Sequence, residues 1–235
     1  MATLLLRLAA PLQSWGTDSK YETRRTGREP SKSGVIGLLA AALGLRRDED
    51  EAIRALSSAL RFGVRVEQEG ELLRDYHMVH KDAKTAYVTN RYYLSDAVFL
   101  VALESEDQGL LTRLDQALRA PAFPLFLGRR SCPPTPPLSL GIRDQDMMTV
   151  LRETAWQASE QVRAKGAPSL RLITDGTTEE TGWGIQRDLP ISFAPSHRRF
   201  ADRAVVHRGF VTPPGEKEGP PEIIHDPMQE LGGAD

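Results

Sequence analysis

The amino-acid sequence predicts an α+β fold, and three observations support this prediction. Short segments with the apolar patterns of strands are interspersed with segments whose apolar residues recur at helical spacing. The 235 residues are numerous enough to bury a core that needs no disulfide or metal. Their composition, 40% hydrophobic and 26% charged, is that of an ordinary globular protein, which excludes a wholly disordered or fibrous chain.

The first predicted elements are a strand, two helices and a second strand. Leucines alternate along residues 3–10, as they do in a strand. A helix follows a polar, basic loop, with Ser31 or Ser33 as its start signal and Gly44 as its terminator. After a second amphipathic helix, residues 61–67 alternate polar and apolar, which predicts a half-buried edge strand.

The next elements complete a recognisable order. Residues 97–103 are apolar on both faces, which suits a central strand covered on each side. Ser105 and Gln108 form a capping box at the start of another helix, and residues 123–127 fit a last short strand. Strand, helix, strand, strand, helix, strand is the order of a ferredoxin-like fold, which RNA-recognition domains also use.

Three further parts extend this predicted ferredoxin-like domain of residues 1–130. Residues 71–95 are rich in Tyr, His, Lys and Arg and too long for a plain turn, so we expect an inserted β-hairpin arm. Residues 131–212, with a strand-like stretch at 169–174, are expected to pack on it as a small β-rich lobe. Residues 213–235 are rich in Pro, Gly and acidic residues, which predicts a flexible acidic tail.

The net charge of −2 is unevenly distributed along the chain. The tail contributes −5 and the remaining 212 residues carry +3, with eight basic against three acidic residues between Arg7 and Arg47. A local excess of this size suits a protein that holds one short anionic segment rather than coating nucleic acid. The single Cys132 excludes an internal disulfide and a cysteine zinc cluster, and no apolar run is long enough for a membrane span. We therefore expect a cytoplasmic protein with no membrane partner.

Several residue strings, in this order along the chain, resemble the Cas5 family of CRISPR-associated proteins, subtype E, to which the CasD subunits of Cascade complexes belong. The matching strings are 11–16 (PLQSWG), 24–28, 30–34 (PSKSG), 73–77 (LRDYH), 96–97, 127–133 (LGRRSCP) and 198–203.

The resemblance implies a member of the repeat-associated RNA-binding (RAMP) superfamily, a ferredoxin-like fold with an arm. It implies a non-catalytic subunit, without cofactor or metal, that caps the 5′ handle of the guide RNA. The implied partners are the guide RNA, a CasC-like backbone subunit beside the arm and a CasA-like large subunit, with target DNA met only through the antiviral complex.

The residues themselves supply what a sharply turned single strand of RNA needs, namely cations, amide donors and flat surfaces. The predicted helix start at Lys32 and Ser33 offers free N–H groups and the positive end of a helix dipole. It follows a loop that contains Arg24, Arg25 and Arg28. The alternative is that a serine merely caps a core helix and the arginines are solvated.

A second group of candidate RNA contacts comes from Gln13, Ser14 and Trp15, which emerge from the first strand at a sheet edge. Trp15 could stack on a base or anchor the core. Gln13 and Ser14 could hydrogen-bond the RNA or simply close the turn.

The remaining candidates lie after the last predicted strand and on the arm. Gly128 allows close backbone approach of a ligand, and Ser131 follows two arginines, of which one is expected to reach RNA and the other to make a structural or subunit contact. On the arm, aromatic residues interleave with basic ones, as in surfaces that grip single strands, although tyrosines could also pack at the root of the hairpin. These candidates are Gly128, Arg129, Arg130, Ser131, Lys84, Arg91 and Tyr92.

Two other functions stay open at this point. One is a metal-independent ribonuclease that processes precursor RNA, with His77 as general acid or base and Tyr76 and Lys81 nearby. The other is a small-molecule enzyme with a nucleotide phosphate at the helix start. The sequence there lacks the spacing of a P-loop, and no pattern of carboxylates or histidines indicates a metal.

Overall fold

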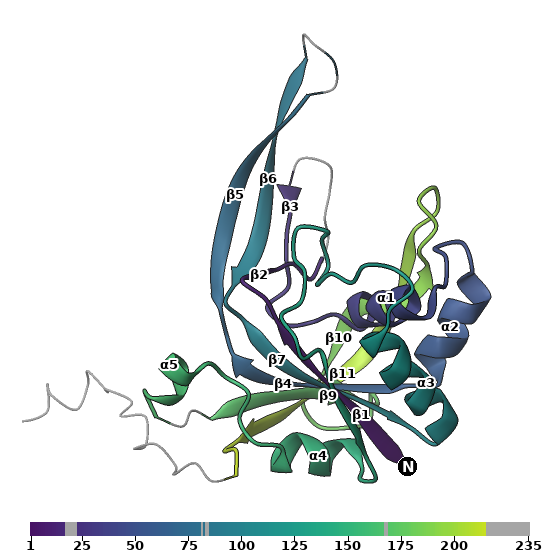
Figure 1. The fold of residues 1–235 in the computed structure, drawn as a ribbon, viewed down its shortest axis with the longest axis vertical. Helices are drawn as coiled ribbons and strands as arrows, with labels where there is room; N and C mark the ends of the chain where they lie inside the picture. The colour runs from purple at the N-terminus through teal and green to yellow at the C-terminus, as the bar shows by residue number, and fades with distance from the viewer. Residues whose placement is uncertain (17–22, 81, 83–84, 167–168, 215–235) are drawn as a thin grey trace, which may run out of the picture.

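The computed structural model describes residues 1–16, 23–80, 82, 85–166 and 169–214. Lys81, Lys84 and residues 215–235 of the predicted tail therefore lie outside the described residues. The body is built on a seven-stranded sheet in which every neighbouring pair is antiparallel (Figure 1). In sheet order its strands are β10 (Trp183–Ser192), β11 (Arg199–Val211), β9 (Leu170–Asp175), β4 (Arg61–Gln68), β7 (Val98–Ser105), β1 (Ala2–Ala9) and β8 (Ser139–Arg143).

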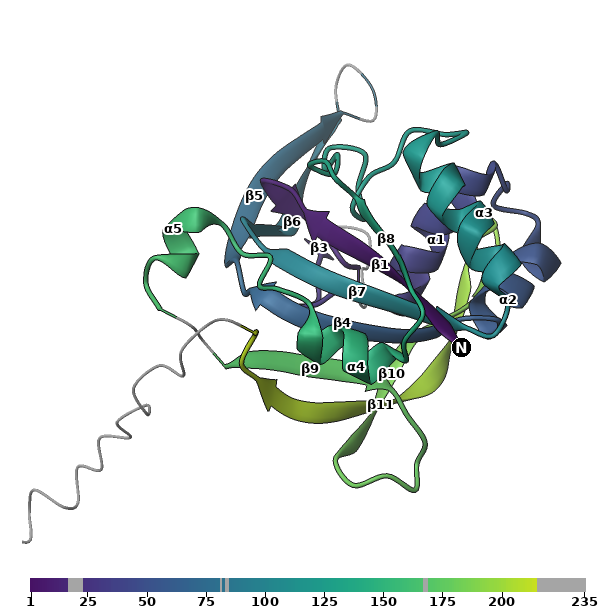
Figure 2. The same cartoon turned by 60° about the horizontal axis from the view of Figure 1, so that its bottom comes forward.

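Helices cover the two faces of this sheet unequally (Figure 2). Three of them form the main core with one face of β1 and β7, on which Leu4, Leu6 and Phe99 are fully buried. On the opposite face, Leu5 and Leu100 pack against a fourth helix. The helices are α1 (Lys32–Leu43), α2 (Asp50–Ser58) and α3 (Gln108–Arg119) on the first face, α4 (Met147–Glu153) on the second and the short α5 (Glu160–Arg163).

The predicted arm is present as a long hairpin that projects from the body (Figure 1). It consists of β5 (Glu71–His80) and β6 (Ala86–Ser95), which pair over ten residues each. On its other edge β6 also pairs with two short segments, β2 (Leu12–Gln13) in antiparallel and β3 (Thr23–Arg24) in parallel orientation. The N-terminal loop is thereby attached to the root of the arm.

Most predicted elements are confirmed, and local signals set several of their ends. Ser31 caps α1 by accepting a hydrogen bond from the Gly34 N–H, and Gly44 ends the helix in the left-handed conformation. The helix α3 begins two residues later than predicted, because Asp107 rather than Ser105 is its N-cap and accepts from the Leu110 N–H.

The strand predicted over residues 123–127 is wrong. This segment is irregular, and the place beside β1 is taken by β8 instead. Pro124 within the segment lacks an N–H donor and Pro121 just before it lacks one too, so this backbone is poorly suited to pair along β1. The later strands β8–β11 extend the same sheet on both sides rather than forming a sheet of their own.

The edge position predicted for residues 61–67 is also wrong, because β4 lies between β7 and β9. Its polar residues Arg65 and Glu67 are not solvated but form a buried ion pair, with Arg65 Nε 2.5 Å from a Glu67 carboxylate oxygen. Arg65 also donates to the carbonyls of Leu151 and Ala155. Burial raises the pKa of Glu67 despite the nearby guanidinium. No helix in the described ranges is long and apolar enough to cross a membrane.

Candidate nucleic-acid interface

The start of α1, predicted to receive phosphate, is already occupied by the chain's own side chains. The Lys32 N–H donates to a carboxylate oxygen of Asp188 at 2.6 Å. Ser31 accepts from the Gly34 N–H at 3.2 Å, and the Ser33 hydroxyl is buried 3.4 Å from that of Ser31. An aspartate at a helix N-terminus satisfies the free N–H groups and the dipole as a phosphate would. The prediction of an open anion site here is therefore wrong.

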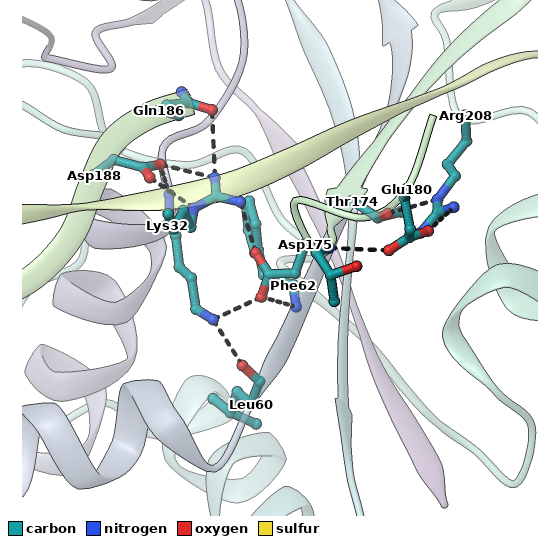
Figure 3. A network of polar contacts seen from close by, with 11 residues as sticks. Lys32, Leu60, Phe62, Thr174, Asp175, Glu180, Gln186, Asp188 and Arg208 are labelled. Atoms are coloured by element: carbon teal, nitrogen blue, oxygen red, sulfur yellow. Dashed lines mark hydrogen bonds and ion pairs between the residues drawn. The ribbon is translucent and has the colours of Figure 1, made fainter. Parts of the chain in front are cut away.

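The Lys32 side chain is also engaged internally (Figure 3). Its Nζ lies 2.7 Å from Asp175 and 2.9 Å from the Leu60 carbonyl oxygen, and only 8% of the side chain is exposed. Arg203 completes the network by pairing with Asp188 at 2.7 Å and with Asp175 at 2.6 Å. The expected contact of Lys32 with RNA is corrected to an ion-pair network that joins α1 to β9, β10 and β11.

Trp15 is a core residue rather than a stacking platform. Its side chain is 1% exposed, and its indole N–H donates to Gln13 Oε1 at 3.1 Å. Gln13 in turn donates to the Ala97 carbonyl at 2.6 Å, which fixes the turn after β1. A Cβ at Gly34 would lie 2.9 Å from the Trp15 ring, so the ring packs tightly on the first turn of α1. Gln13 and Trp15 are thus corrected from RNA contacts to internal ones.

Gly128 does permit a close approach, but the approaching group belongs to the chain itself. It has a φ of +87°, and a Cβ there would lie 1.7 Å from the Ser14 carbonyl oxygen. The Ser14 N–H donates to the Leu127 carbonyl at 3.1 Å, and its buried hydroxyl donates to the Tyr92 carbonyl at 3.3 Å. Ser14 therefore joins the loop after Leu127 to the arm, which corrects the expected RNA contacts of Ser14 and Gly128.

Beyond this buried layer, cationic side chains gather where the arm meets the body. The Arg129 guanidinium lies over the Tyr93 ring, 4.5 Å from its centroid, and donates to the Arg24 carbonyl at 2.9 Å. Arg91 on β6 faces Arg24 on β3 in the register of the second sheet. Arg130, next to Arg129, is exposed. We call this region the arm junction and define it by these five residues. Tyr93 is not among the RNA contacts predicted from the sequence, although it belongs to the aromatic pattern of the arm.

The accessible candidates are thus a subset of the predicted ones. Arg24, Arg28 and Arg130 are exposed and have no ion-pair partner within the described ranges. Arg25 and Ser131 are exposed as well, whereas Arg91, Tyr92 and Arg129 are half-buried.

Two other reactive side chains, Cys132 and His77, differ in their surroundings. Cys132 is buried, and burial raises the pKa of its thiol, which suits a packing residue rather than a nucleophile. His77 on β5 lies 3.8 Å from an Asp75 oxygen, with both side chains well exposed. In the part of the chain that the structure describes, no group of three or more His, Cys, Asp or Glu residues could hold a metal ion.

The family model described as CRISPR-associated protein (Cas_Cas5) matches residues 3–206. The chain therefore belongs to the Cas5 family.

Individual relatives agree with this family. The CRISPR system Cascade subunit CasD of Escherichia coli (strain K12) is 40% identical over 156 residues, which cover 59% of this chain and 70% of CasD. A chain of a CRISPR RNA-guided surveillance complex is 32% identical with a TM-score of 0.73, and the match covers 89% of this chain and 91% of that one. A crystal structure of a Cas protein is 41% identical with a TM-score of 0.69, covering 89% and 95%.

Proposed function

We propose that this chain is the CasD-type subunit of a Cascade complex and that it holds the 5′ handle of the guide RNA without cutting it. Support comes from the 40% identity to a Cascade subunit and from the similarity to a chain of an RNA-guided surveillance complex over 89% of the present sequence. The proposal includes a ferredoxin-like unit at the centre of the body. The sheet order β8-β1-β7-β4, with α1 and α3 in the two crossovers, supports it.

The observation that carries this proposal is a set of exposed arginines at the arm junction and in the segment that precedes α1. Arg24, Arg28 and Arg130 are exposed without carboxylate partners in the described part of the chain, although the body provides such partners for Lys32 and Arg203. Exposed guanidinium groups that lack internal counterions are the groups that bind RNA phosphates, and each phosphate contact releases counterions.

The arm supports the expected protein partners. It exposes large apolar side chains, among them Leu72 at 61%, Tyr76 at 67% and Met78 at 56%. Apolar side chains concentrated on a projecting element indicate a surface that is covered in an assembly. We infer that the arm lies over the first part of the guide beside a CasC-like backbone subunit, and that a CasA-like large subunit and target DNA are met through the complex.

Co-purification of RNA tests the proposed function. The tagged chain is expressed with its complex and its CRISPR array, and the bound RNA is sequenced at its protected 5′ end. We expect a repeat-derived handle, and we expect its retention to fall when Arg24, Arg28 and Arg130 are replaced by alanine. The matched control replaces the exposed Arg46, Arg54 and Arg113 of the helical side. Normal retention in the first triple variant would refute the RNA-binding surface.

A second candidate function is cleavage of precursor RNA, which the pairing of His77 with Asp75 favours. A carboxylate beside an imidazole can orient it as a general base or acid. Incubation of labelled repeat RNA with the chain in EDTA decides between binding and cleavage. We expect no specific product, whereas a cut that disappears in His77→Ala would establish the ribonuclease.

A further inference from the structure

Among the residues that the structure describes, two guanidinium nitrogens at the arm junction are buried with no hydrogen-bond partner. They are Nε of Arg91 and Nη1 of Arg129. Unsatisfied donors on a charged group are among the more costly features of a folded protein, and they are therefore uncommon without a ligand or a compensating group. Both side chains are only half-buried, so another part of each remains open to solvent.

The strand register brings the two guanidinium groups to the same region, where β3 pairs with β6 of the arm. Arg91 and Tyr93 are two residues apart on β6, so their side chains share a face of the sheet. Arg129 covers Tyr93 on that face and donates to the carbonyl of Arg24, which is the register partner of Arg91 on β3. Arg91 and Arg129 therefore lie on the same face of the arm, beside the place where β3 pairs with β6.

No carboxylate neutralises this pair within the described residues. Asp75 is the cross-strand neighbour of Arg91 on β5, but it forms no ion pair with Arg91. One of its oxygens instead lies 3.8 Å from Nδ1 of His77. Two like charges beside each other, each with an unsatisfied donor, favour an anion with several oxygen acceptors.

We propose that one phosphodiester of the bound RNA sits between Arg91 and Arg129 and clamps the arm to the body. This inference rests on the proposed function and names the place where a single phosphate is held. Arg129 already contacts the arm through Tyr93 and β3 through the Arg24 carbonyl, and an anion that also engages Arg91 adds a second link between the Arg129 loop and the arm. The exposed Arg24 and Arg130 flank the position and suit the neighbouring phosphates of the same strand.

A thermodynamic cycle between protein and RNA tests the proposal. The probe is an RNA with the 5′ sequence that co-purifies with the complex, made as a series in which one linkage at a time is an uncharged methylphosphonate. The proteins are the full chain, Arg91→Ala and the charge-matched control Arg113→Ala, an exposed position on α3. Nε of Arg91 has no hydrogen-bond partner within the described ranges, so we expect Arg91→Ala to fold, and thermal melting of each variant checks this.

We expect one linkage whose neutralisation weakens binding to the unaltered chain and to Arg113→Ala but has no further effect on Arg91→Ala. The slope of log affinity against log salt should be smaller by about 0.7 in Arg91→Ala, the value for one phosphate of a single strand. Arg129→Lys, which keeps the charge but not the planar fork, should lose the same linkage effect. If the RNA binds but no linkage is coupled to Arg91, the phosphate site between Arg91 and Arg129 is wrong and the proposed function stands. If the unaltered chain does not bind the RNA, the proposed function is wrong.

Discussion

Replacing Lys32 by methionine separates its structural role from the RNA contact that its sequence position suggests. The substitution keeps the length of the side chain but removes an ion pair of 2.7 Å with Asp175, whose side chain is 19% exposed. Breaking a buried pair by removing one partner costs about 3–5 kcal/mol. Asp175 retains Arg203 at 2.6 Å and the Phe62 N–H at 3.0 Å, so we expect a smaller loss of about 2–3 kcal/mol.

Urea denaturation and thermal melting of the full chain measure this loss. For a chain of this size, the expected decrease corresponds to a melting temperature lower by about 4–12 °C. Lys165→Met makes the same chemical change at an exposed side chain and should stay within about 0.5 kcal/mol of the unaltered chain. The salt dependence of RNA binding should not change in Lys32→Met. An unchanged stability together with a slope reduced by about 0.7 would refute the internal network and restore Lys32 as a phosphate contact.

Three further substitutions test the corrected and the predicted contacts by denaturation. Gly128→Ala should lower the free energy of unfolding by about 3 kcal/mol, because it combines a left-handed φ with a collision against the Ser14 carbonyl. The control Gly166→Ala, at a positive φ but in open space, should lower it by only about 1 kcal/mol. Equal losses in the two variants would exclude the collision. Trp15→Ala should lose about 3–5 kcal/mol as a core truncation, and a stable variant with weakened RNA binding would return Trp15 to the interface. Asp146 caps α4, and its hydrogen bonds with Thr149 lower its pKa, so Asp146→Ala should cost about 1 kcal/mol at neutral pH. Because the lowered pKa stabilises the fold only where the carboxylate is ionised, this difference should begin to shrink below about pH 3.9 and be lost as the pH passes through the lower pKa of the folded state; a difference that does not shrink in acid would contradict the cap.

Elements set by neighbouring residues could be predicted from the sequence, and contacts between distant segments could not. Ser31 and Gly44 mark the ends of α1 through hydrogen bonds within the helix, so the local sequence was enough to predict both ends. Lys32 looked like a free cation because Asp175, the counterion of its ammonium group, is 143 residues further along the chain. Asp188, which accepts from its backbone N–H, is 156 residues further along.

The dependence on distant contacts also explains why the position of β4 in the sheet was predicted wrongly. The alternation of β4 is correct, but its polar face is buried because Arg65 and Glu67 neutralise each other and bind the chain near residue 155. A pattern of polar residues shows which side chains share a face and does not show what covers that face. The candidate site was predicted in outline by the basic loop, and only the fold separated Arg24 and Arg130 from the buried Lys32.

The placement of β5 has a consequence for how the subunit must be produced. In the described part of the chain, this ten-residue strand pairs with β6 alone, so its outer row of N–H and C=O groups is available to another strand. Leu72 and Met78 are exposed on the same strand. A long, open, apolar edge is a template for strand addition between copies of a protein. A surplus of this subunit over its assembly partners would therefore tend to self-associate through the arm, which favours matched synthesis of the subunits over separate preparation.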